Sequence, residues 1–276
     1  MNSRKVALVT GATSGIGQAT AHRLHARGYL VYGAGRNPDA LDALRARGLR
    51  ARSLDVTDEA AVTRLVDDIN AEHGAVDVLV NSAGITDRGV LEQKTPAEVR
   101  ALFEMHVVVP LHLSQAVLPG MRARGTGTIV NIGSIAGRVT GPAGGAYHMV
   151  KSGLEPLSLG LRAEVAQFGV RVTVVDPTGV RTPFFESEFN EVWTYADDDP
   201  YGPFMRRRDE SVRKLAKMPG AAIKAETVAR AVVRAIESKN PRPRYVVGAS
   251  GRATVLMRAL ATDRMWERIM LAGMKP

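Results

Sequence analysis

The chain has 276 residues, of which 45% are hydrophobic and 24% charged, a composition typical of a globular protein with one large or two small domains. It contains no cysteine, which excludes disulfides and thiolate metal sites, and we expect no metal site. The net charge is +9. The arginines are scattered along expected helices rather than clustered, so a solvated basic surface is favoured over nucleic-acid binding.

No hydrophobic region typical of a signal peptide begins the sequence, because MNSRKVALVTG leads directly into a strand pattern. We also expect no apolar run that approaches the ~20 residues needed to span a bilayer. The sequence therefore predicts a cytoplasmic protein without stable membrane insertion.

Short apolar runs, each typical of a buried parallel strand, alternate with helical patterns along the chain. The expected strands are residues 5–9, 30–34, 51–54, 76–80, 128–132, 170–175 and 244–247. The expected helices are residues 18–27, 38–48, 57–73, 96–121, 145–168 and 225–238, and the regular pattern lapses between residues 177 and 225. This alternation predicts an α/β fold: one doubly wound Rossmann-like domain over residues 1–276, with a central parallel sheet of about seven strands.

A glycine-rich turn follows the first expected strand. In TGATSGIG the glycines are Gly11, Gly15 and Gly17, and a helical pattern begins there. Glycines in this place allow a tight turn, a close approach of the backbone to a pyrophosphate, and close packing of helix on strand. The N-terminus of the helix adds free N–H groups and a positive dipole end. The alternative is a tight turn without a ligand.

The end of the second expected strand bears on the choice of cofactor. A carboxylate there would bond the ribose 2′-hydroxyl of NAD, whereas an arginine accommodates the 2′-phosphate of NADP. The strand ends at Gly35, which has no carboxylate, and Arg36 follows. NADP (NADPH) is therefore favoured over NAD, the alternative being that Arg36 is simply solvated.

Tyr147 and Lys151 lie four residues apart in a helical pattern, so they share one face of that helix. A protonated lysine beside a phenol favours the phenolate and lowers the pKa of Tyr147, so the tyrosine can exchange a proton with an alcohol or carbonyl oxygen. Ser134 follows an expected strand at the edge where parallel sheets bind ligands. The spacing of Tyr147 and Lys151 alone is also common on solvated helix faces.

Four motifs together resemble the short-chain dehydrogenase/reductase superfamily, in its single-domain branch. They are TGATSGIG (residues 10–17), Asp55-Val56, NSAG (residues 81–84), and Ser134 with YHMVK (residues 147–151). They occur in the family's order and at its usual spacings. The resemblance implies a dinucleotide cofactor and a reaction at CH–OH groups.

The resemblance also assigns roles to cofactor-binding residues. Asp55 would bond the adenine amino group, Val56 would lie along the ring, and Ala83 and Gly84 would pass close to the adenosine ribose. Asn81 is expected to fasten the central strands. The full expected cofactor set is Gly11, Thr13, Ser14, Gly15, Ile16, Gly17, Arg36, Asp55, Val56, Asn81, Ala83, Gly84, Tyr147, Lys151, Pro177, Val180 and Thr182.

The segment DPTGVRTP (residues 176–183) resembles the family's Pro-Gly segment beside the nicotinamide. Val180 and Thr182 would hold the carboxamide there. Thr178 replaces the usual glycine after Pro177, so the backbone at this point is expected to differ from the family pattern.

The resemblance implies that hydride passes between a nicotinamide and a substrate carbonyl carbon. Ser134 would orient the substrate oxygen, Tyr147 would act as general acid or base, and Lys151 would hold the nicotinamide ribose and favour the phenolate of Tyr147. The function expected is an NADP(H)-dependent oxidoreductase that interconverts a carbonyl and a secondary alcohol.

His106 departs from the family pattern, because the family has an asparagine at the matching position of a long helix. That asparagine binds a water that relays protons from the lysine to solvent. An imidazole can also hold a water, so one hypothesis is that His106 takes part in the relay and in catalysis. The alternatives are a buried histidine with a satisfied hydrogen bond, or an impaired enzyme.

Half of the aromatic residues lie between residues 184 and 204, where the resemblance predicts a substrate lid at about residues 183–220. They are Phe184, Phe185, Phe189, Trp193, Tyr195, Tyr201 and Phe204. Such a cluster suits a bulky apolar or aromatic substrate, the alternative being a lid that packs its own small core. A helical tail is expected at about residues 250–276, with a tail lying on a membrane as a less favoured alternative.

Two other function classes remain to be compared with the reductase. A dinucleotide sensor or scaffold on the same fold commonly loses the tyrosine or the lysine, and this chain keeps both. Sugar epimerases and dehydratases with the same pair usually need a longer C-terminal substrate domain. The resemblance also implies a homodimer or homotetramer, in which the two long helices pair across two-fold axes.

Overall fold

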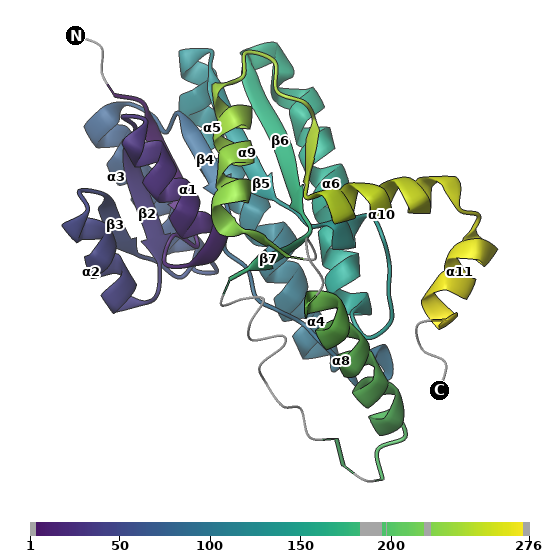
Figure 1. The fold of residues 1–276 in the computed structure, drawn as a ribbon. Helices are drawn as coiled ribbons and strands as arrows, with labels where there is room; N and C mark the ends of the chain where they lie inside the picture. Colours follow the sequence, from purple (N-terminus) through teal and green to yellow (C-terminus); the bar gives the residue numbers. More distant parts are fainter. Residues whose placement is uncertain (1–3, 183–194, 197, 218–221, 273–276) are drawn as a thin grey trace.

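Seven parallel strands form the central sheet, in the order β3-β2-β1-β4-β5-β6-β9 (Figure 1). The computed structural model describes residues 4–182, 195–196, 198–217 and 222–272. The strands of the sheet are β1 (Val6–Thr10), β2 (Leu30–Gly35), β3 (Arg50–Ser53), β4 (Val78–Asn81), β5 (Gly127–Ile132), β6 (Val170–Pro177) and β9 (Arg244–Val247). The chain changes direction between β1 and β4, so their carboxyl ends form the switch point of a doubly wound sheet. The predicted fold class is confirmed.

Helices cover both faces of this sheet (Figure 1). One face carries α1 (Gly15–Ala26), α2 (Pro38–Ala46) and α9 (Ala225–Glu237), and the other carries α3 (Glu59–His73), α5 (Val109–Arg124) and α6 (Gly145–Val165). Leu24 of α1 and Val117 of α5 are fully buried against opposite faces. Every residue of β1 (VALVT) is buried, because a parallel strand covered on both faces is apolar on both sides.

Side-chain caps fix the starts of several helices. Asp58 accepts a hydrogen bond from the Ala61 N–H at 2.9 Å and begins α3 one residue later. Thr95 and Glu98 form a reciprocal capping box at the start of α4 (Pro96–Phe103). These local signals explain why the expected and observed helix starts agree closely at these positions.

The helix expected at residues 96–121 is interrupted. It consists of α4, a π-helical turn (Glu104–Val108) and α5. Pro110 accounts for the interruption, because it has no N–H to donate to the carbonyl of His106 four residues earlier. The Val109 N–H instead bonds the carbonyl of Glu104, five residues earlier. His106 therefore lies in an irregular turn of the kind often found at functional sites.

The prediction that regular structure lapses between residues 177 and 225 is wrong in part. The short strands β7 (Gly179–Arg181) and β8 (Ala222–Lys224) pair with each other, and α8 (Gly202–Lys217) lies between them in sequence. Strands of three residues are too short to show a period in the sequence. In α8 the consecutive arginines 206–208 obscure the apolar pattern that marks a helix.

One helical stretch, Pro96–Arg124, is long and apolar enough to cross a membrane by length and composition, contrary to the expectation that no run approaches that length. Half of its most apolar window is buried inside the protein. Leu113, Val117 and Met121 belong to the core on that face of the sheet. Core helices of water-soluble proteins pass the same test, so the stretch does not by itself indicate a membrane span.

The expected C-terminal tail contains α10 (Ala249–Leu260) and α11 (Asp263–Ala272), which extend beyond α6 in Figure 1. Trp266 of α11 is buried, and its indole N–H donates to the carbonyl of Thr140 at 3.1 Å. This contact fastens the tail to the loop that follows β5.

Candidate active site

A cavity of about 540 Å³ lies at the carboxyl ends of the central strands. It is lined by the glycine turn after β1, the ends of β4 and β5, and the segment after β6, whose Thr182 lies beside Gly15 of the turn. Every residue predicted to bind the cofactor or to act in catalysis lines it, except Gly17 and Asn81. The predicted residues that do line it are Gly11, Thr13, Ser14, Gly15, Ile16, Arg36, Asp55, Val56, Ala83, Gly84, His106, Ser134, Tyr147, Lys151, Pro177, Val180 and Thr182.

The glycine turn fits the pyrophosphate of a dinucleotide. Gly11 and Gly15 have φ values of +64° and +53°, a conformation that favours glycine. A Cβ on Gly17 would overlap the carbonyl oxygen of Gly11, so the start of α1 packs directly on this turn. Ser14 precedes α1 and makes no side-chain cap, which leaves the first N–H groups of the helix for an anion.

Arg36 and Asp55 also line the cavity. Their charged groups lie 3.9 Å apart, and the side chain of Arg36 is 69% exposed. Hydrogen bonds from the backbone and hydroxyl of Thr57 hold the pKa of Asp55 below its ordinary value. A Cβ on Gly35 would lie 2.6 Å from Cγ2 of Thr13, so a carboxylate cannot occupy position 35 unless Thr13 moves.

Asn81 lies among the strands, where it was expected to fasten them. Its Nδ2 donates to Oδ1 of Asn131 at 2.8 Å, and Nδ2 of Asn131 donates to the hydroxyl of Ser158 at 2.8 Å. These bonds join β4, β5 and α6 beneath the cavity.

Ser134, Tyr147 and Lys151 line the cavity where α6 meets the end of β5. Ser134 directly follows β5 and Gly133, and its hydroxyl accepts a hydrogen bond from the Ala136 N–H at 3.1 Å. Tyr147 and Lys151 lie in the first turns of α6, and Nζ of Lys151 is 5.7 Å from the centre of the Tyr147 ring. The spacing in the sequence therefore places an ammonium beside a phenol, as predicted from the helical period.

Lys151 is almost fully buried, with 6% of its surface exposed. Its Nζ donates to the carbonyl oxygen of Ile132 at 3.1 Å, at the end of β5. Burial lowers the pKa of Lys151 to about 8, and the nearby carboxylate of Asp176 acts in the opposite direction. The side chain thus changes charge in the range where enzymes work.

His106 is buried beside the same pair. Its Nε2 lies 2.8 Å from the carbonyl oxygen of Ile85, so the ring carries its proton there and donates it. The ring meets that of Tyr147 edge-on, with 5.6 Å between their centres. Burial and then the charge of Lys151 lower the pKa of His106 to about 3, so the ring is neutral near pH 7.

His148 also lines the cavity and was not identified from the sequence. Its Nδ1 donates to the carbonyl of Ala136 at 2.8 Å, and its Nε2 accepts from the Gly141 N–H at 3.2 Å. Both bonds hold the loop after β5 against α6. The sequence carried no signal for this role beyond the position next to Tyr147.

α8 lies near the mouth of the cavity. Met205 packs with Val90 and Ala143 in a small buried cluster, against which the partly buried aromatic residues Tyr195, Tyr201 and Phe204 rest. A buried ion pair between Arg88 and Asp209 joins α8 to the segment after β4, and the Tyr195 hydroxyl donates to Asp209 at 3.0 Å. The remaining aromatic residues of the predicted lid, Phe184, Phe185, Phe189 and Trp193, lie outside the described residues.

The sequence matches the short chain dehydrogenase family over residues 5–193. This chain belongs to that family. The glycine turn and the group formed by Ser134, Tyr147 and Lys151 both fall within the matched segment.

Relatives of this short-chain dehydrogenase include named reductases. The 3-ketodihydrosphingosine reductase of Bacteroides thetaiotaomicron is 32% identical over 244 residues, with 88% of each chain covered. The NADPH-dependent 3-dehydrocapnine reductase of Ornithobacterium rhinotracheale is 29% identical over 280 residues, with 98% of each chain covered. A short-chain dehydrogenase structure from Streptomyces avermitilis matches with a TM-score of 0.80 at 36% identity, covering 97% of each chain. The protein is an NAD(P)-dependent oxidoreductase.

The substitution Gly17→Ala tests the glycine turn. The added Cβ overlaps the Gly11 carbonyl, so the turn must open and the affinity for NADPH should fall by about tenfold or more, equivalent to ~1.4 kcal/mol. Fluorescence titration with NADPH measures this loss, and urea unfolding checks that the variant is folded. The matched control is Gly160→Ala in α6, where nothing lies within 4 Å of the added Cβ. A folded Gly17→Ala protein with wild-type affinity would contradict the assignment.

Proposed function

We propose that this short-chain dehydrogenase uses NADP(H) to interconvert a carbonyl and a secondary alcohol on a bulky apolar or aromatic small molecule. Ser134, Tyr147 and Lys151 carry the reaction. The supporting observation is that a buried ammonium and a phenol lie together in a cavity that the glycine turn after β1 also lines.

In this proposal NADPH, when bound, supplies the hydride that reduces the substrate carbonyl carbon. The hydroxyl of Ser134 donates to the substrate oxygen and orients it. The hydroxyl of Tyr147 gives its proton to that oxygen as negative charge develops there, and in the reverse direction the phenolate takes the proton back. The ammonium of Lys151 favours the phenolate and holds the ribose hydroxyls.

The remaining contacts follow the walls of the cavity. The glycine turn at residues 11–17 holds the pyrophosphate on the N-terminus of α1. Asp55 and Val56 hold the adenine, and Val180 and Thr182 hold the nicotinamide carboxamide. All four line the cavity.

Tyr147→Phe removes only the acidic hydroxyl. General acid catalysis contributes about 10²–10⁴-fold, so turnover should fall by at least that factor while the affinity for NADPH stays nearly unchanged. Steady-state rates and NADPH fluorescence titration measure the two quantities separately. Tyr29→Phe, at the start of β2 and away from the cavity, is the matched control and should keep full activity. Retained activity in Tyr147→Phe would refute the mechanism.

We propose further that the cofactor is NADP rather than NAD, and that Arg36 binds the 2′-phosphate. Gly35 lacks the acid that a ribose 2′-hydroxyl needs, and Thr13 fills the space where such a side chain would begin. Arg36 lines the cavity and its side chain is 69% exposed, and a guanidinium can make a charge-assisted contact with a phosphate.

Arg36→Ala should raise KM for NADPH by about tenfold or more and leave KM for NADH unchanged, because only NADPH carries the extra phosphate. Arg47→Ala, at the end of the adjacent α2 and outside the cavity, is the control for a loss of surface charge. Equal use of both cofactors, unaffected by Arg36→Ala, would refute the choice of NADP.

We also propose that His106 takes the place of the family's asparagine in the proton relay. Two of its atoms suit a water. Nδ1 of the neutral ring is an acceptor, because Nε2 carries the proton that Ile85 binds. The main-chain carbonyl of His106 has no α-helical donor, because residue 110 is proline.

His106→Asn separates these two atoms, because it changes the side chain and keeps the carbonyl. If the ring carries the relay, the pH dependence of kcat should change, with activity lowered most where proton return limits turnover. pH–rate profiles of the wild type and the variant measure this. Superimposable profiles would remove the imidazole from the relay and leave the carbonyl as its site.

The proposal of a bulky apolar substrate rests on the aromatic cluster of the sequence at residues 184–204, part of which packs around Met205 on α8, the helix whose Arg208 lines the cavity. The two relatives named above reduce ketones, according to their names. NADPH oxidation screened over ketones, aldehydes, steroids and quinones tests the substrate class.

A homodimer or homotetramer is also proposed, since Phe103 of α4 and Leu159 of α6 are exposed on the helices that would pair. A cytoplasmic location stays a prediction.

A further inference from the structure

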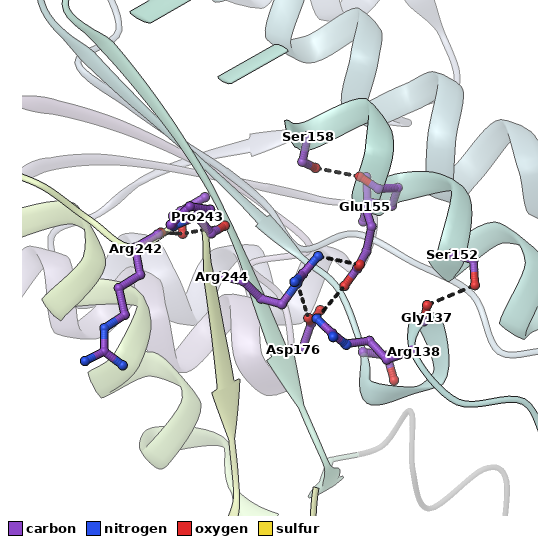
Figure 2. A network of polar contacts seen from close by, with 12 residues as sticks. Gly137, Arg138, Ser152, Glu155, Ser158, Asp176, Arg242, Pro243 and Arg244 are labelled. Atoms are coloured by element: carbon purple, nitrogen blue, oxygen red, sulfur yellow. Dashed lines mark hydrogen bonds and ion pairs between the residues drawn. The ribbon is translucent and has the colours of Figure 1, made fainter. Parts of the chain in front are cut away.

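A second cluster of ionisable side chains lies where β6, β9 and α6 meet (Figure 2). Asp176 comes from the end of β6, Glu155 from α6 one turn after Lys151, and Arg244 from β9. Arg138, from the loop after β5, approaches the same group. Asp176 is fully buried, at 0% exposure, and does not line the cavity. Asp176 begins the segment DPTGVRTP, but neither that motif nor the proposed reaction assigns it a role.

Arg244 bridges the two carboxylates. Its Nη2 lies 2.5 Å from Oε2 of Glu155, and its Nε lies 3.6 Å from Oδ2 of Asp176. Strand register explains the arrangement. Arg244 pairs with Val174 on β6, and Asp176 is two residues further on the same face, which α6 covers. The nearest nitrogen of Arg138 is 3.9 Å from Oε1 of Glu155.

The carboxylate of Asp176 lies against the main chain that carries the site. A Cβ on Gly133 would overlap Oδ1 of Asp176, so the glycine is required by this contact. Gly133 separates Ile132, whose carbonyl binds Lys151, from Ser134. A negative charge on Asp176 therefore sits next to the two residues that position the ammonium and the substrate.

The carboxyl pair is short of hydrogen-bond donors. Among the described residues, no N–H or hydroxyl group donates to either oxygen of Asp176 or to Oε1 of Glu155, because the arginine contacts of 3.6 and 3.9 Å are too long to count. The remaining donor is a carboxyl proton of the pair itself. Two carboxylates cannot bond each other unless one keeps a proton. Burial, then the charge of Glu155 and a hydrogen bond with it, raise the pKa of Asp176 to about 7, against the opposing charges of Arg244 and Arg138.

Lys151 meets few other charges. Tyr147 faces it from α6, and His106 faces it from the π-helical turn but is neutral at working pH. Asp176 is the group that opposes the effect of burial on the ammonium. The pair thus loses its proton, and gains its second negative charge, just below the pH at which Lys151 would become neutral.

We propose that Asp176 is a positioning residue for the reaction: held by Glu155 and Arg244, its carboxylate is the counter-charge that keeps Lys151 an ammonium from neutral to mildly alkaline pH. This inference rests on the proposed roles of Lys151 and Tyr147. Asp176 touches neither substrate nor cofactor and acts through Lys151 alone.

Asp176→Asn is the direct test, because asparagine has the shape of the protonated acid and can still meet Glu155 and Arg244. Below about pH 6 the variant should reduce ketones like the wild type. At that pH the Asp176 carboxyl of the wild type is protonated, so in both proteins the side chain at position 176 is neutral and can hydrogen-bond Glu155. Above pH 7 Lys151 of the variant lacks the negative charge that Asp176 supplies in the wild type, so its ammonium loses its proton more easily. The alkaline limb of the kcat/KM profile should therefore move about one pH unit lower, which is a loss of activity of up to tenfold near pH 8.

Glu155→Gln should not lower the alkaline limb of the kcat/KM profile, in contrast to Asp176→Asn. It removes the charge and the carboxyl partner that keep Asp176 protonated, so Asp176 ionises at lower pH and the alkaline limb should not move down. The control is Asp42→Asn, which changes the same groups in an exposed pair with Arg45 at 2.5 Å, remote from the cavity. It should leave the profile unchanged.

Thermal unfolding of the cofactor-free protein tests, without an activity assay, whether the carboxyl groups of Asp176 and Glu155 share a proton. The pKa of Asp176 is raised on folding, so its stabilising contribution is complete below about pH 4 and is lost as pH rises through 7. The Tm of Asp176→Asn should therefore depend less on pH between 4 and 7 than that of the wild type, and exceed it at pH 8.

The outcomes separate this inference from the proposed function. A uniform loss of activity at every pH, or an unmoved alkaline limb, in folded Asp176→Asn would overturn the positioning role. A downward shift in Glu155→Gln would also overturn it, and this variant carries the test if Asp176→Asn does not fold. If the wild type reduces no carbonyl compound, the proposed function fails. Parallel curves of Tm against pH for the wild type and Asp176→Asn would by themselves refute the proton shared between Asp176 and Glu155.

Discussion

The arrangement of the candidate site depends on the contacts that the buried ammonium of Lys151 makes with its acceptors. An isolated charge in a protein interior costs several kcal/mol, so acceptors must be brought to it from the surrounding elements. The carbonyl of Ile132 comes from the end of β5, and the carboxylate of Asp176 comes from the end of β6. Both strands end at the same edge of the sheet, so the first turns of α6, which contain Lys151, must pack against that edge. Tyr147 lies in the same turns and is therefore placed at this edge as well. Packing and chemistry thus share one set of contacts.

Local signals made most of the fold predictable from the sequence. Parallel strands covered on both faces are apolar throughout, as in β1, and glycines and caps mark where helices begin. The glycine turn and the pair Tyr147 and Lys151 were also local, because a fixed spacing on a helix sets which side chains share a face. What the sequence could not supply was the distance between these motifs, which the sheet alone sets.

The features that were missed depend on residues distant in the chain. Asp176 resembles an ordinary strand end before Pro177, and only the pairing of β6 with β9 brings Arg244 to it. The helix at residues 202–217 is too polar to reveal a buried stripe, yet the ion pair of Arg88 with Asp209 attaches it beside the cavity. The π-helical turn is different, since Pro110 was visible in the sequence and its missing N–H already implied an irregular helix.

The bond from Trp266 to the carbonyl of Thr140 joins the last helix of the described chain to the loop between Ser134 and Tyr147. Helix α11 therefore supports the loop whose residues Pro142 and Gly144 line the cavity. Loss of the Trp266 indole removes the N–H that holds this loop, so a helix distant in the sequence contributes to the order of the cavity wall.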